Sequence, residues 1–98
     1  MRNEIIKDDL EAKIKLEYTE DSVFIHLDLF VWSRDILRRI DKELLEIGKT
    51  LKEKGYEFLY TYNRKEDEKW VRFVTLVGFD FAFLLENKSI FVYDLRGI

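Results

Sequence analysis

The feature that most constrains the fold is the stretch from Val23 to Tyr62, which reads as a strand, a long helix and a second strand. Residues 23–32 are mostly β-branched and aromatic, which predicts a strand. Apolar residues then recur every three or four positions, which predicts one buried stripe on a helix of about six turns; they are Ile36, Ile40, Leu44, Ile47 and Leu51. Residues 56–62 predict the next strand. Such a unit usually forms a parallel crossover, so we expect it at the centre of a mixed sheet.

The ends of both helices are marked in the sequence. Ser33 can accept a hydrogen bond from the first turn of the long helix, and Gly55 suits the left-handed position that ends many helices. A shorter helix is expected to begin at Asn63, because Asn63 and Glu66 resemble a capping box. Gly78 is expected to end it.

Two hairpins complete the predicted sheet. Residues 11–19 alternate between apolar and charged side chains, which predicts a half-exposed strand paired with the long strand. Two further strands, joined by a turn, are expected at residues 79–85 and 89–95. Residues 1–10 should be frayed or lie along an edge. We therefore predict an α+β fold with a mixed five-stranded sheet and two helices, in the order β-β-α-β-α-β-β, as a single domain over residues 1–98 with its core in residues 11–95.

Composition excludes several classes of site and partner. The 98 residues are 38% charged with a net charge of −3, which is a poor footprint for nucleic acid. The chain has no cysteine and one histidine, so thiolate and multi-histidine metal sites are excluded. No apolar run approaches the ~20 residues of a membrane span, and the first residues lack the apolar core of a signal peptide. We expect no membrane partner and a location inside a cell or in a particle assembled there.

Aromatic side chains are predicted on both faces of the sheet, although only two helices are available to cover them. The helices either cover opposite faces or leave one face partly bare. A bare face would be a contact surface for a protein partner or a second copy of the chain; otherwise the rings belong to an ordinary core. The alternation of the two central strands selects the candidate interface residues, which are Phe24, Phe30, Trp32, Tyr56, Phe58, Tyr60 and Tyr62.

The order of elements and the run from Tyr62 to Phe79 resemble the GNAT acetyltransferase superfamily. Its members commonly have an asparagine after the strand, here Asn63, and then an aromatic-rich helix that ends as Val77-Gly78-Phe79 does. The chain is most similar to small GNAT-like proteins of bacteriophages, including internal virion proteins, in which a strand ending in Val-Trp runs directly into a basic helix. The resemblance covers residues 23–95 and implies a truncated GNAT-like fold.

The chain differs from this family at the positions that bind the cofactor and catalyse acetyl transfer in active members. Active members bind the coenzyme A pyrophosphate on main-chain N–H groups of a glycine-rich loop at the start of the long helix. Residues 31–39 contain no glycine, so only Ser33, Arg34 and Arg38 remain as candidate cofactor-binding residues. The alternative is that they form a solvated basic flank. Many members carry a tyrosine as general acid where this chain has Val74, and the parts that shape the acceptor site are largely missing.

Other chemistry is sparse. His26 and Asp28 share a face of the long strand, where they form either an acid–base pair or a polar pair within the sheet. The tyrosines of residues 56–62 are similar to the stacking platforms of single-strand nucleic-acid binders, but the strand carries no lysine or arginine. The run Glu66-Asp67-Glu68 points in different directions along a helix and predicts no metal site.

We interpret the chain as a phage-type GNAT-fold protein that has lost acetyl transfer and acts without a cofactor by binding protein. It would be a virion component or an inhibitor of a host system, located in the host cytoplasm or the virion. The alternative is a minimal acetyl-CoA-dependent N-acetyltransferase. A single-strand nucleic-acid module is a third, more distant hypothesis.

Overall fold

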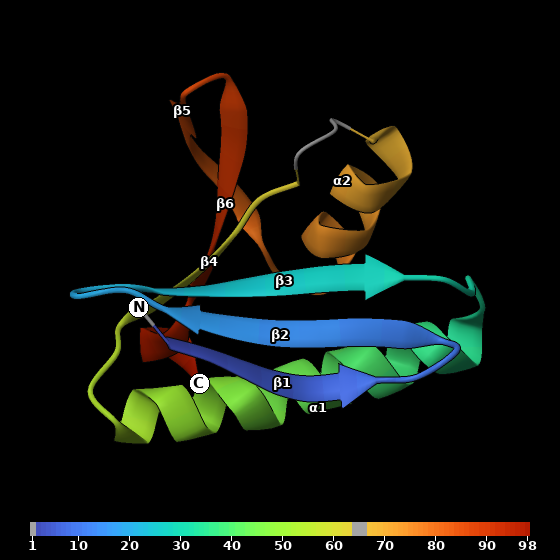
Figure 1. The fold of residues 1–98 in the computed structure, drawn as a ribbon, viewed down its shortest axis with the longest axis horizontal. Helices are drawn as coiled ribbons and strands as arrows, with labels where there is room; N and C mark the ends of the chain where they lie inside the picture. Colours follow the sequence, from blue (N-terminus) through green and yellow to red (C-terminus); the bar gives the residue numbers. More distant parts are fainter. Residues whose placement is uncertain (1, 64–66) are drawn as a thin grey trace.

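The protein is described by a computed structural model that covers residues 2–63 and 67–98. The described chain contains six strands and two α-helices in the order β-β-β-α-β-α-β-β, followed by a 3₁₀ turn at Leu95–Gly97 (Figure 1). The strands are β1 (Arg2–Asp8), β2 (Ala12–Tyr18), β3 (Val23–Leu29), β4 (Phe58–Thr61), β5 (Asp80–Leu85) and β6 (Lys88–Asp94). The helices are α1 (Arg34–Glu53) and α2 (Glu68–Leu76). The α+β class predicted from the sequence is confirmed.

The strands form one mixed sheet in the order β1-β2-β3-β4-β6-β5. All neighbours are antiparallel except β3 and β4, which are parallel, as the predicted crossover requires. The predicted count of five strands is wrong by one, because residues 2–8 form an edge strand that pairs with β2. This strand is mostly exposed and mixed in charge, so its sequence carries no burial pattern.

The β1–β2 turn is held by Asp9. Its carboxylate accepts main-chain hydrogen bonds from Glu11 at 2.8 Å and Ala12 at 3.0 Å. The ammonium group of Lys7 lies 3.0 Å from the same carboxylate. This contact, followed by the two main-chain bonds, holds the pKa of Asp9 below its ordinary value.

Helix α1 begins and ends where the sequence predicts. The Ser33 hydroxyl accepts the Ile36 N–H at 3.2 Å and caps the helix. After the C-cap residue Lys54, Gly55 adopts a φ of +98°, a conformation that costs little only for glycine. The buried side of the helix is formed by Ile36, Ile40, Leu44, Gly48 and Leu51, with Ile47 partly buried beside them.

Helix α2 starts later than predicted. Its N-cap is Asp67, whose carboxylate accepts the Lys69 N–H at 2.9 Å, and the helix begins at Glu68. The predicted capping box between Asn63 and Glu66 includes a residue that lies outside the described ranges. Gly78 follows the helix with a φ of +111°, which agrees with the predicted end.

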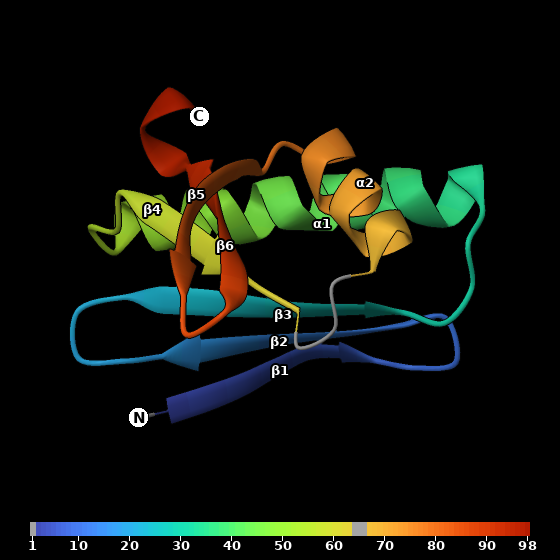
Figure 2. The ribbon, with the colours of Figure 1, turned by 90° about the horizontal axis from the view of Figure 1, so that it is seen from above.

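Both helices pack on the same face of the sheet. Figure 2 shows α1 and α2 on one side of β1, β2 and β3. The core contains Ile40 of α1 and Phe73 of α2 together with Ile14 and Leu27 of the sheet. The sequence left open whether the helices cover opposite faces or leave one face partly bare. The structure shows the bare face: within residues 2–63 and 67–98, no helix covers the side opposite α1 and α2.

No described helix is long and apolar enough to span a bilayer. The described side chains also form no group of three or more potential metal ligands.

Candidate functional site

The strands β3 and β4 separate soon after they meet. Their parallel ladder has one register pair in the described chain, Phe24 with Tyr60. Beyond it, two carbonyls of β3 are satisfied by side chains. The Thr61 hydroxyl donates to the Ile25 carbonyl at 2.7 Å, and the Trp70 indole N–H donates to the Leu27 carbonyl at 3.1 Å. Both bonds are buried, so side chains replace the ladder where the strands diverge.

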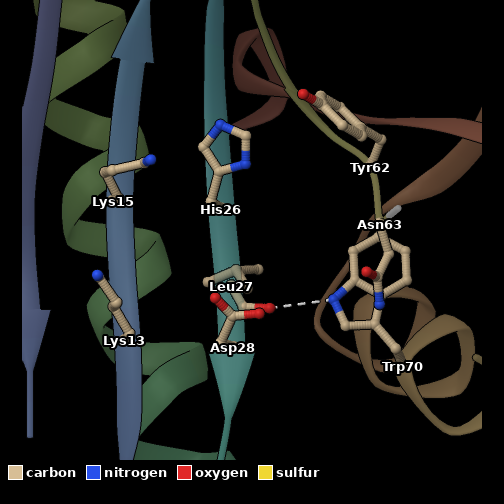
Figure 3. A pocket seen from close by; sticks show the side chains of 8 residues that line it. All are labelled: Lys13, Lys15, His26, Leu27, Asp28, Tyr62, Asn63 and Trp70. Carbon is tan, nitrogen blue, oxygen red and sulfur yellow. Dashed lines mark hydrogen bonds between the residues drawn. The ribbon is translucent and has the colours of Figure 1, made fainter. Parts of the chain in front are cut away.

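A pocket of about 250 Å³ lies beside this opening (Figure 3). Strand β2 supplies two lysines, β3 supplies polar and apolar residues, the segment after β4 supplies two more residues, and α2 supplies the indole. The lining residues are Lys13, Lys15, His26, Leu27, Asp28, Tyr62, Asn63 and Trp70. Alternation along β2 and β3 places the lysines, His26 and Asp28 on the face that the helices leave open.

The contacts of His26 decide between the two roles open to it. Its Nε2 atom lies 3.3 Å from Glu17 Oε1 on the neighbouring strand, and its ring meets the Tyr62 ring edge-on at 5.5 Å. His26 and Asp28 line the same pocket, as predicted, but the carboxylate that contacts the imidazole is that of Glu17. His26 is therefore part of a polar network across the sheet. It does not contact Asp28, which would have to orient the imidazole if the two formed an acid–base pair.

The start of α1 does not fit the pyrophosphate of coenzyme A as the family binds it. The Ile36 N–H, one of the free donors of the first turn, is already taken by Ser33. Asp35 adds a negative charge in the first turn, where an anion would have to bind. Arg34 and Arg38 are exposed side chains and no glycine brings the main chain near a ligand. The three candidate cofactor-binding residues therefore lie near one another along the helix without forming a main-chain cradle.

Space next to this helix start is filled by aromatic side chains. The Trp32 ring meets the Phe73 ring edge-on at 5.6 Å, and Lys69 Nζ lies 4.7 Å from the Trp32 ring centre. Val74, at the position where the resemblance implies a tyrosine acid, is fully buried in the core. A buried aliphatic side chain there supports packing and can carry no proton.

Part of the predicted interface forms one group on the open face. Consecutive ring contacts at 5.6–6.4 Å connect four predicted residues and one that the prediction missed. We call this group the aromatic cluster; its members are Phe24, Phe58, Tyr60, Tyr62 and Phe83. Phe83 lies on β5, and its contact with Tyr60 depends on the strand order β4-β6-β5, which local alternation does not reveal.

The other three predicted interface residues are not part of the aromatic cluster, and two of them, Trp32 and Tyr56, pack against the core instead. Tyr56 meets the buried Tyr18 at 6.2 Å and packs against the core. Trp32 packs on Phe73, and Phe30 lies past the end of β3 with 58% of its surface exposed. The reason is the shortness of the strands: β3 ends at Leu29 and β4 begins at Phe58, so alternation does not extend to these positions.

Comparison with known proteins identifies the fold. No protein-family model matches the sequence, and no curated protein matches it significantly. Two solved structures are similar. The PaiA N-acetyltransferase of Thermoplasma acidophilum, in complex with coenzyme A, has a TM-score of 0.67 and 19% identity over 86% of this chain and 53% of its own. An N-acetyltransferase of Staphylococcus aureus Mu50 has a TM-score of 0.61 and 19% identity over 88% and 61%.

The chain thus spans between half and two thirds of the length of these two enzymes. At this level of identity the likeness concerns the arrangement of the backbone. The described chain has the fold of GNAT-type N-acetyltransferases.

Proposed function

We propose that this chain acts by binding another polypeptide on the open face of its sheet, and that it does not transfer acetyl groups. The observation that carries the proposal is the placement of both helices on one face, which leaves the aromatic cluster without a helix over it. Apolar surface left in water is unfavourable by roughly 25 cal/mol per Å². A partner that covers the rings would recover this free energy.

The composition of the cluster also suits a contact with protein. Tyrosine is enriched in interfaces because its ring buries a large area while its hydroxyl keeps a polar partner. Two cations border the rings: Lys88 Nζ lies 5.0 Å from the centre of Tyr62, and the Arg96 guanidinium lies 4.8 Å from that of Phe58. An aromatic centre with a charged border is typical of binding surfaces.

The resemblance to phage proteins extends this proposal. In that form the chain is a virion component or an inhibitor of a host system, and its place is the host cytoplasm or the virion. The fold is compatible with many functions, so this part of the proposal depends on the resemblance alone.

Tyr60→Glu is expected to abolish self-association while the domain stays folded, because a buried carboxylate at the centre of the cluster would be costly. Light scattering at high micromolar concentration should give a dimer for the wild type and a monomer for the variant. Leu10→Glu is the matched control, since Leu10 is a 91% exposed apolar residue away from the cluster, and it should leave the dimer intact.

A wild type that is monomeric under these conditions would contradict self-association. The proposal would then require that the open face binds a different protein. A photo-reactive amino acid at position 60, compared with the same amino acid at position 10, tests binding of such a partner in cells through the yield of cross-linked protein. Equal cross-linking at both positions would contradict partner binding on the open face.

The second candidate function is acetyl transfer, which the fold similarity to two N-acetyltransferases favours. We expect no binding of acetyl-CoA by calorimetry at about 1 mM ligand, because the start of α1 offers no main-chain cradle. Micromolar affinity that is lost in Arg34→Ala would overturn this expectation and favour the enzyme. Arg72→Ala is the matched control, because Arg72 is an exposed arginine on the other helix.

A further inference from the structure

The pocket beside the opening between β3 and β4 is lined by two cationic side chains, Lys13 and Lys15, and by one anionic side chain, Asp28. The phenol of Tyr62 and the imidazole of His26 can each donate or accept a hydrogen bond. Its 250 Å³ is below the usual range of roughly 300–1,000 Å³ for drug-sized ligands, so the occupant would be a small group.

The two lysines lack carboxylate partners. Lys13 and Lys15 are half-buried, and neither forms an ion pair with any residue in the described ranges. Lys13 lies directly across the ladder from Asp28 without reaching it, and Glu17, two positions along β2, is engaged with His26. Two neighbouring cations on the same face therefore add their fields over the pocket.

We propose that this pocket binds a small oxyanion, a carboxylate or a phosphate group, with Lys13 and Lys15 as its charge partners. An ammonium ligand would find one carboxylate, Asp28, against two cations, so the pocket is unsuited to the protonated amine that an N-acetyltransferase would accept. The rings of Tyr62 and Trp70 provide an apolar side for whatever carries the anion. The site does not depend on the proposed protein contact, because the isolated chain would bind the anion without a partner.

Trp70 makes the site measurable. Its indole N–H donates to the Leu27 carbonyl at the wall of the pocket, so its NMR signal should respond to an occupant. The other indole, that of Trp32, is identified by its absence in Trp32→Phe. Sodium phosphate and sodium acetate are titrated separately into the ¹⁵N-labelled full chain at constant ionic strength, with sodium chloride as the reference salt.

We expect the Trp70 signal to shift saturably with phosphate, acetate or both. Saturation by phosphate alone assigns the site to a phosphate-bearing ligand, and saturation by acetate assigns it to a carboxylate. The double variant Lys13→Ala/Lys15→Ala should weaken binding by about tenfold or more, since charge-assisted contacts are lost. Lys13→Arg/Lys15→Arg should retain it. Lys42→Ala/Lys49→Ala removes two exposed lysines of α1 and is the matched control.

Asp28→Asn tests the sign of the ligand's charge. Removing this carboxylate takes away a repulsion, so the variant should bind the anion several-fold more tightly. Weaker binding in Asp28→Asn, an equal loss in the α1 control, or a shift that stays linear with concentration would overturn the proposal. These results leave the light-scattering test of Tyr60→Glu unaffected, so failure of the pocket and failure of the protein contact are distinguishable.

Discussion

Leu44→Ala is expected to lower the free energy of unfolding by about 2–5 kcal/mol. Leu44 lies at the middle of the buried stripe of α1 and is 2% exposed. Truncation removes three carbons from the core and leaves a cavity that the helix and sheet can close only in part. Urea denaturation of the variant and the wild type measures the difference.

Leu45→Ala is the matched control for this change. Leu45 is the next residue on the same helix and is 37% exposed, so its truncation should cost less than about 1 kcal/mol. A Leu44→Ala variant whose unfolding midpoint equals that of the wild type would contradict the packing of α1 on the sheet.

Gly78→Ala is expected to cost about 2–4 kcal/mol, because two penalties add at this residue. Its φ of +111° is unfavourable for any side chain. A Cβ atom at Gly78 would also lie 2.9 Å from Cε2 of Tyr93, whose ring packs on the buried Phe79. The same denaturation measurement applies.

Gly55→Ala separates the two penalties. Gly55 has a similar φ of +98°, but a Cβ atom there would have no neighbour within 4 Å. This variant should therefore cost about 1–2 kcal/mol from backbone strain alone. If the two alanine variants lose the same stability, the Tyr93 contact adds nothing.

The long helix could be predicted from the sequence because its signals are local. The cap at Ser33, the apolar spacing through Leu44 and the left-handed Gly55 all act within a few residues of the chain. The parallel crossover followed from the same stretch. These local signals agree with the tertiary structure, so the prediction and the fold coincide there.

The missed features depend on contacts between distant segments. Strand β1 forms by main-chain pairing with β2, and its charged side chains give no sign of it. Phe83 meets Tyr60 across β6, the strand that pairs with β4 on one side and with β5 on the other. Trp32 and Tyr56 lie beyond the ends of β3 and β4, where strand alternation no longer determines the direction of a side chain.

The pocket could be foreseen only in part. The sequence placed His26 and Asp28 on one face, and alternation placed Lys13 and Lys15 on the outer side of their strand. The sequence did not predict that β3 and β4 separate, and the pocket lies beside this separation. Where the strands separate, the Leu27 carbonyl accepts its hydrogen bond from Trp70, a residue 43 positions further along the chain.

The separation of β3 and β4 also determines how the two halves of the sheet are joined. One half of the sheet, β1-β2-β3, and the other, β4-β6-β5, meet at one ladder position, one side-chain hydrogen bond from Thr61 and the ring contact of Phe24 with Tyr60. A net hydrogen bond contributes only about 1 kcal/mol, whereas each half is held by full antiparallel ladders. Where the ladder stops, the two halves are therefore joined mainly by the core, in which Ile25 of one half and Leu59 of the other pack in the same cluster as both helices. Along this line the sheet is held by side-chain packing rather than by main-chain pairing, so substitutions in the core there should loosen the join more than substitutions in the strands' edges.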